Sequence, residues 1–97
     1  MKTTQEYIDL LRSHADVLKR EYGITSMVLF GSVARGEHTE SSDVDVFVDM
    51  PPVYYDACGA NDYLEDMVGC HVDMIRKHRN LTPYFVKQVE ADGIRIF

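Results

Sequence analysis

The chain has 97 residues and a formal net charge of -6 at pH 7. This length suits one compact domain, and the acidic balance differs from the basic surface of a general nucleic-acid binder. No apolar run reaches the length of a membrane span, and the N-terminus lacks the apolar core of a signal peptide. We therefore expect a cytoplasmic protein that binds neither membranes nor, in a stable way, nucleic acid.

The chain opens on a predicted helix. Thr3 and Glu6 have the spacing of a capping box, in which two side chains satisfy free N–H groups at a helix start. Apolar residues then recur at helical intervals up to Tyr22, and Gly23 follows as a typical residue after a helix end. The pattern predicts one continuous helix that ends at Tyr22.

A strand and a short helix are expected next. Residues 24–30 are mostly apolar and rich in strand formers, which predicts a buried strand. Gly31 and Ser32 break this strand, and Ser32 is expected to cap a short helix that Gly36 ends. A polar loop over residues 37–42 follows.

The second half of the chain predicts alternating strands and helices. The stretch 54–69 is ambiguous, and only its second part, from Asn61, has a helical pattern. The expected elements are a strand over 43–48 that Pro51-Pro52 stops, a helix over 61–69, a strand over 71–75, a helix from Thr82-Pro83 to Gly93, and a strand over 94–97. Together they indicate one α/β (α+β) domain over residues 1–97, with a small mixed β-sheet flanked by helices.

The two cysteines indicate neither a disulfide framework nor a metal site. Cys58 and Cys70 lack CxxC spacing, so we expect reduced thiols in or near the core. Cys70, His71 and His78 raise zinc as an alternative, but their spacing fits no known set of zinc ligands.

Three aspartates in predicted strands carry the candidate chemistry. Asp43 and Asp45 alternate with valines, so both carboxylates lie on one face of their strand. A solvated edge strand would explain this alternation by itself, but Asp73 adds an acid among apolar residues in a later strand. If the two strands are neighbours, like charges gather in one place and need a cation to neutralise them. Oxygen ligands favour Mg²⁺ or Mn²⁺, and two such ions on shared carboxylates serve in the cleavage of phosphoesters and triphosphates.

A candidate phosphate cradle precedes these acids. Gly31 permits close approach of the backbone, Ser32 offers a hydroxyl, and the following helix start offers free N–H groups. An ordinary strand-to-helix turn is the commoner meaning of Gly-Ser alone. A P-loop is excluded, because the Lys and Ser or Thr expected after its second glycine are replaced by Glu37 and His38.

The stretch GSVARGEHTESSDVDVFV resembles the minimal nucleotidyltransferase (MNT) family of the DNA polymerase beta-like nucleotidyltransferase superfamily. The signature is Gly31-Ser32, ten intervening residues, and then Asp43-Val44-Asp45, with Asp73 where that family keeps its third acid. The resemblance implies the polymerase beta-like nucleotidyltransferase fold, with ATP as substrate and two Mg²⁺ ions, or Mn²⁺, as cofactors.

The resemblance also implies a role for each acid. Asp43 and Asp45 would hold both metal ions, and Asp73 would complete the metal site and help to activate the attacking hydroxyl. All three are therefore candidate catalytic and metal-binding residues.

Nucleotide binding would fall to the residues around the glycine turn. Gly31 and Ser32 would bind the outgoing phosphates. Arg35 would neutralise triphosphate charge or, as an equal alternative, pair on the surface with Glu37 or Glu40.

Larger polymerase beta-like enzymes carry a helical domain for the acceptor, for which 97 residues leave no room. By resemblance, the chain is similar to the antitoxin of HEPN/MNT toxin-antitoxin systems, which silences a HEPN-domain toxin by adding AMP to a tyrosine. Two alternatives stay open: a non-catalytic module that neutralises its partner by contact, and a transferase acting on a small molecule or an RNA end.

Overall fold

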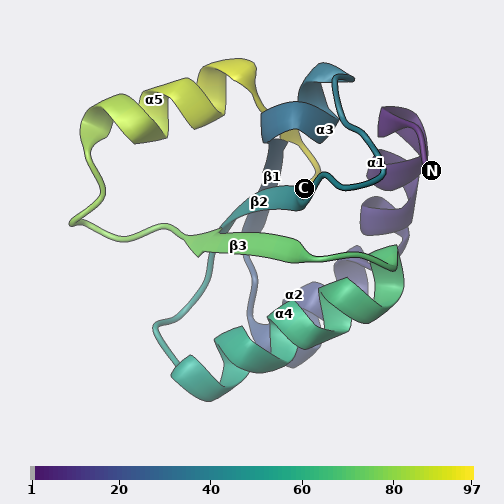
Figure 1. The fold of residues 1–97 in the computed structure, drawn as a ribbon. Coiled ribbons are helices and arrows are strands. Elements are labelled where there is room, and N and C mark those ends of the chain that lie inside the picture. The colour runs from purple at the N-terminus through teal and green to yellow at the C-terminus, as the bar shows by residue number, and fades with distance from the viewer. Residues whose placement is uncertain (1) are drawn as a thin grey trace.

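The computed structural model of the protein describes residues 2–97 and contains a four-stranded sheet with helices on both faces (Figure 1). The strands lie in the order β3-β2-β1-β4, with β2 and β3 parallel and the other neighbours antiparallel. The elements are α1 (Thr4–Ser13), α2 (Ala15–Tyr22), β1 (Ser26–Phe30), α3 (Gly31–Arg35), β2 (Val44–Asp49), α4 (Tyr54–Val68), β3 (Val72–Arg76), α5 (Pro83–Asp92) and β4 (Ile94–Arg95). This confirms the predicted small mixed sheet flanked by helices. No helix within residues 2–97 has the length and apolar character needed to cross a bilayer.

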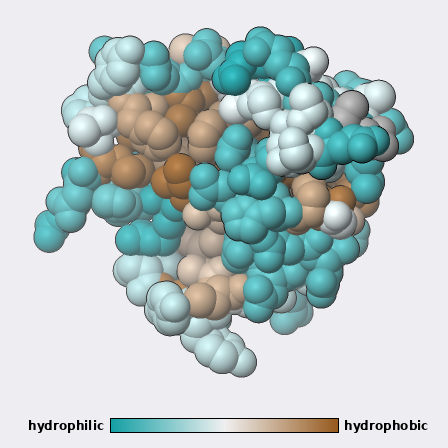
Figure 2. Space-filling view, in the orientation of Figure 1, coloured by the Kyte–Doolittle hydropathy of each residue, from teal (hydrophilic) through white to brown (hydrophobic). Residues whose placement is uncertain are grey.

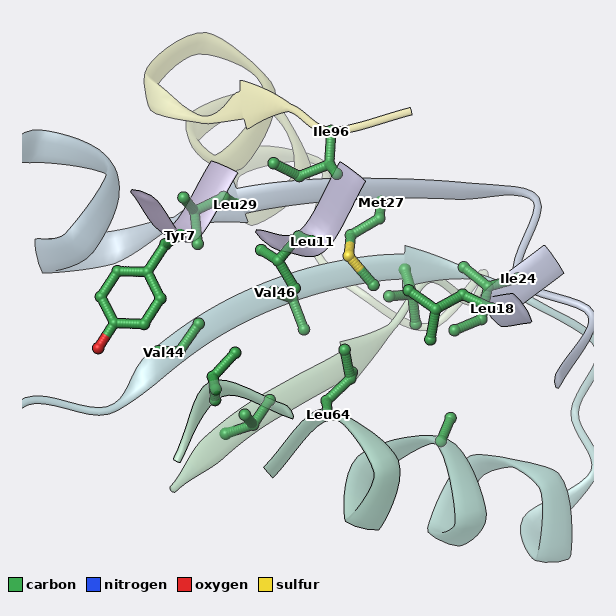
Figure 3. Close-up of a cluster of buried hydrophobic side chains, with 14 of the residues drawn as sticks. Tyr7, Leu11, Leu18, Ile24, Met27, Leu29, Val44, Val46, Leu64 and Ile96 are labelled. Atoms are coloured by element: carbon green, nitrogen blue, oxygen red, sulfur yellow. The ribbon is translucent and has the colours of Figure 1, made fainter. Parts of the chain in front are cut away.

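The hydrophobic core lies on one face of the sheet, against the helices α1, α2 and α4. Side chains alternate along a strand, so every second residue of β1 and β2 points to this face. Each leucine buried there contributes about 1.5–3 kcal/mol relative to an exposed one. The residues labelled in Figure 3 are buried: Tyr7, Leu11, Leu18, Ile24, Met27, Leu29, Val44, Val46, Leu64 and Ile96.

The opposite face of the sheet carries α5 and an aromatic cluster. Phe85 of α5 packs edge-on against Phe30 and Phe47, with ring centroids 6.2 and 6.1 Å away. Phe47 is only 4% exposed, although it shares a face with Asp45. The acid-bearing face is therefore covered over part of its area.

The prediction of one continuous N-terminal helix is wrong, because the helix breaks at His14. The backbone leaves the helical region there (φ -103°, ψ 9°), and His14 Nδ1 lies 2.6 Å from the hydroxyl of Tyr63 on α4. Leu11 of α1 and Leu18 of α2 are fully buried on either side of this break. The capping box of Thr3 and Glu6 is confirmed.

The ambiguous stretch from Tyr54 is helical throughout, not only from Asn61. Gly59 obscured the pattern, because glycine disfavours a helix interior. In the fold its lack of a side chain makes room for Tyr22, since a Cβ there would lie 3.1 Å from the tyrosine ring. Cys58 on this helix is exposed, so its expected place in or near the core is wrong, whereas Cys70 is half-buried.

The helix start predicted at Thr82-Pro83 is confirmed, because the Thr82 side chain accepts a hydrogen bond from the N–H of Phe85. The expected cap at Ser32 is wrong. Helix α3 begins at Gly31, two residues before the start that a cap at Ser32 would give, and its N-cap position is held by Phe30 with no side-chain hydrogen bond.

Candidate active site

Two of the three acids are direct neighbours across the parallel strands β2 and β3. Asp45 of β2 pairs in register with Asp73 of β3, so both side chains lie on the same face of the sheet. Asp43 lies on the same face, two residues before Asp45 and one before the start of β2. Asp43 and Asp73 are exposed, and Asp45 is half-buried. The strand arrangement therefore gathers three carboxylates at one end of the sheet.

Gly31 is packed directly against the central acid. Its φ of +76° lies in the left-handed region, which side-chain-bearing residues rarely adopt. A Cβ on Gly31 would overlap Oδ2 of Asp45 and would also lie 3.1 Å from its Cγ. Glycine is thus needed at this turn for its backbone conformation and for the room that it leaves to the Asp45 carboxylate.

The electrostatics of the site favour a bound cation. Burial raises the pKa of the Asp45 carboxyl above its ordinary value, and repulsion from Asp73 and Asp43 adds to this rise. The positive charges of Arg35 and His71 lower the same pKa and only partly offset the rise. When Asp45 is ionised, it is therefore repelled by the neighbouring carboxylates, and a bound divalent cation would neutralise this repulsion.

His71, which the sequence raised only as a possible zinc ligand, lies beside the acids. Its Nδ1 lies 3.3 Å from Oδ1 of Asp43, and its Nε2 lies 3.8 Å from Oε2 of Glu65. Side-chain alternation along the strand could have revealed this position, because His71 lies two residues before Asp73 and so points to the same face. The contact places a basic ring beside the first acid.

The two candidate phosphate ligands of α3 differ in what they contact. Ser32 is half-buried, and its hydroxyl makes no hydrogen bond to any group within residues 2–97. Arg35 pairs with Glu37, with Nε 3.4 Å from Oε1, and both side chains are at least half exposed. Exposed ion pairs of this kind contribute only about 0–1 kcal/mol, so a phosphate group can compete for Arg35.

A hollow of about 260 Å³ adjoins the glycine turn. It is bounded by Phe30, Gly31 and Arg35 on one side and by Phe85, Gln88, Val89 and Asp92 of α5 on the other. Figure 2 shows hydrophobic surface gathered beneath α5, over the region where the aromatic rings pack. The site thus joins a carboxylate cluster, a glycine turn and an apolar recess.

Mg²⁺ fits the donor set of this site. Among residues 2–97, no group of three His, Cys, Asp or Glu side chains is arranged to hold a metal ion as it stands. The three candidate side chains nevertheless offer only carboxylate oxygens, which hard cations prefer. Since Asp43 and Asp73 are exposed, rotation about their side-chain bonds can turn them toward Asp45.

The fold, with the strand-borne acids beside the Gly31 turn, is that of the nucleotidyltransferase class. Residues 11–96 match the Nucleotidyltransferase domain family, and the chain belongs to this family. It is 41% identical over 98 residues to a protein of Methanocaldococcus jannaschii named as a protein adenylyltransferase, covering 99% of this chain and 100% of that one.

Solved structures show the same architecture. A minimal nucleotidyltransferase is 29% identical and superposes with a TM-score of 0.79, covering 96% of this chain and 95% of the other. A structure of a tri-AMPylated Shewanella oneidensis HEPN toxin in complex with an MNT antitoxin gives a TM-score of 0.64 at 18% identity, covering 93% of this chain and 71% of the other. At that identity the second match shows the fold only.

Proposed function

We propose that this nucleotidyltransferase moves AMP from ATP to a hydroxyl group of a partner protein. The observation that carries the proposal is the register pair of Asp45 and Asp73 beside the Gly31 turn. Similarity over the whole chain to a relative named as a protein adenylyltransferase supports a protein as the acceptor. Residues 1–97 would form a single nucleotidyltransferase domain that works in the cytoplasm, where ATP is available.

The acids and the glycine turn divide the binding tasks. Asp43, Asp45 and Asp73 would hold two Mg²⁺ ions, or Mn²⁺, which when bound neutralise triphosphate charge and stabilise the departing pyrophosphate. The free hydroxyl of Ser32 would donate a hydrogen bond to an outer phosphate. Gly31 lets the phosphates approach the backbone without displacing Asp45.

Arg35 and Asp73 would each assist the transfer. Arg35 would leave its weak surface pair with Glu37 and bind the triphosphate. Asp73 would accept the proton of the acceptor hydroxyl. The acceptor oxygen then bonds to the α-phosphorus, the bond from that phosphorus to the bridging oxygen breaks, and pyrophosphate leaves with the electron pair.

The proposed partner is a HEPN-domain toxin, with a tyrosine as the modified residue. The support is the similarity in fold to the MNT antitoxin that was solved with an AMPylated HEPN toxin. In this role the chain is an antitoxin, and AMPylation silences the partner.

Intact-mass spectrometry tests this proposal. The purified product of the adjacent gene, incubated with the chain, ATP and Mg²⁺, should gain one or more AMP units, and tandem spectra should place them on tyrosine. The Asp43→Asn/Asp45→Asn variant should add none while its melting temperature shows that it remains folded. A partner that binds, loses its activity and gains no mass would favour the contact-only module, and a partner that neither binds nor gains mass would favour a small-molecule acceptor.

A further inference from the structure

The outer edge of strand β3 is open to pairing with another strand. β3 (Val72–Arg76) ends the sheet, with β2 as its neighbour on one side only. In Figure 1 it lies in front, with α5 above and α4 below, and no described element crosses it. Open strand edges offer unpaired N–H and C=O groups to extended segments of other chains.

Hydrogen bonds at both ends of β3 show which backbone groups face β2. The C=O of His71 accepts a hydrogen bond of 3.0 Å from the N–H of Val44. The N–H of Lys77 donates one of 2.7 Å to the C=O of Val48. Because the direction of these groups alternates along a strand, odd-numbered residues of β3 bond to β2. The N–H and C=O of Met74 therefore point outward.

One outward group of β3 already has a partner, and the central one does not. The N–H of Val72 donates a hydrogen bond of 3.0 Å to Oε2 of Glu65. The half-buried Met74 has no hydrogen bond on its outer side to any group within residues 2–97. An outward N–H and C=O that no group of the protein engages are available to bond an added strand.

A groove runs along this edge and reaches Asp73. It encloses about 360 Å³ between β3 and α4 and is lined by Ala57, Cys58, Asn61, Asp62, His71, Val72, Asp73 and Met74. Along an added strand, side chains would point alternately into this groove and onto the face that carries Asp73. The same strand would thus be anchored by the groove and present alternate residues to the acids.

Register places one residue of the added strand at the reacting centre. Asp45 of β2 pairs in register with Asp73 of β3. A residue of the added strand that pairs with Asp73 would extend this row across the sheet, about 4.8 Å beyond Asp73. Its side chain would lie on the same face as both carboxylates. A tyrosine ring is long enough to carry its hydroxyl from there back over Asp73.

We propose that the acceptor protein binds as an extended segment paired to the outer edge of β3, with its hydroxyl-bearing residue opposite Asp73. This inference rests on the proposed function and names how the acceptor is held. The edge is acidic at one end, with Asp62 and Asp73, and basic at the other, with Arg76 and Lys77. The added segment is therefore basic where it lies beside the acidic end and acidic where it lies beside the basic end. A second copy of this chain suits the edge less well, because each copy carries a net charge of -6.

Amide exchange measured by NMR tests the open edge directly. In the free protein, the N–H of Met74 should exchange quickly, while those of Asp73 and Ile75, bonded to β2, should be protected. Addition of the product of the adjacent gene should slow exchange at Met74. Protection of Met74 in the free protein, with a dimeric mass in solution, would assign the edge to a second copy and overturn the inference.

A matched pair of variants provides the functional test. Met74→Pro removes the outward N–H without breaking the ladder to β2, and proline is tolerated at such positions of edge strands. Met74→Ala removes the side chain alone and is the control. At low acceptor concentration we expect AMP transfer to be about tenfold slower for the proline variant than for the alanine variant, with equal ATP binding.

The outcomes separate the two proposals. Equal transfer by the two variants, or acceptor binding that leaves exchange at Met74 unchanged, would overturn the edge-pairing mode and leave the proposed function standing. Absence of AMP transfer by the wild-type chain to any bound partner would refute the proposed function itself.

Discussion

Replacing Gly31 by alanine tests how closely the glycine turn and the acid cluster depend on one another. Gly69→Ala is a matched control, because Gly69 has nearly the same φ (+78° against +76°) and no atom within 4 Å of the added Cβ. A left-handed conformation costs alanine about 1–2 kcal/mol at either position. At Gly31 the new methyl group must also push the Asp45 side chain out of its rotamer, for a further cost of about 1 kcal/mol.

Thermal unfolding measures this difference. For a domain of this size, about 1 kcal/mol corresponds to about 4–8 °C in Tm, so Gly31→Ala should melt that much lower than Gly69→Ala. The Asp45→Ala background should remove the excess, because the displaced carboxylate is no longer there. The gain in Tm on adding Mg²⁺ and ATP should survive in Gly69→Ala and be lost in Gly31→Ala. Equal melting of the two glycine variants, with the ligand effect retained in both, would refute the reasoning.

Three further predictions concern single side chains of the site. Asp45→Asn should raise the Tm of the metal-free protein at pH 7, because the folded state raises the pKa of Asp45 and so disfavours its ionised form. This advantage over wild type should shrink as the pH falls through the raised pKa and vanish below the ordinary value, where aspartate is protonated in both states; an advantage that persists at low pH would contradict the assigned cause. Ser32→Ala should weaken binding of ATP more than that of AMP in calorimetry, since the predicted contact goes to the outer phosphates, and equal losses would make Ser32 a turn residue only. Asp73→Asn should slow AMP transfer strongly while ATP still binds, and an unchanged rate would remove Asp73 from proton transfer.

Local patterns in the sequence predicted most of the sheet and the arrangement of the acids. Alternation placed Asp43 and Asp45 on one face, and the parallel neighbour β3 brings Asp73 beside Asp45. Whether β2 and β3 are neighbours could not follow from alternation alone, because pairing depends on contacts between distant parts of the chain. The resemblance to a known family supplied that expectation.

The errors arose where tertiary contacts override local preference. The break at His14 has no glycine or proline to mark it, and it serves the contact with Tyr63 on a distant helix. Conversely, the stretch before Asn61 had no clear helical pattern, yet α4 is continuous through Gly59, where the missing side chain makes room for Tyr22. The burial of Phe47 under Phe85 was missed for the same reason, since α5 is distant in sequence.

The central claim is that the acid cluster directs transfer of the α-phosphoryl group of ATP, with its nucleoside, to a partner. The most direct measurement incubates the chain, Mg²⁺ and the product of the adjacent gene with ATP labelled at the α-phosphate or, in parallel, at the γ-phosphate. The account predicts that the α-label appears on the partner and the γ-label in pyrophosphate, with both signals lost in Asp43→Asn/Asp45→Asn. Appearance of the γ-label on the partner, or α-labelling that is undiminished in the double variant, would contradict it.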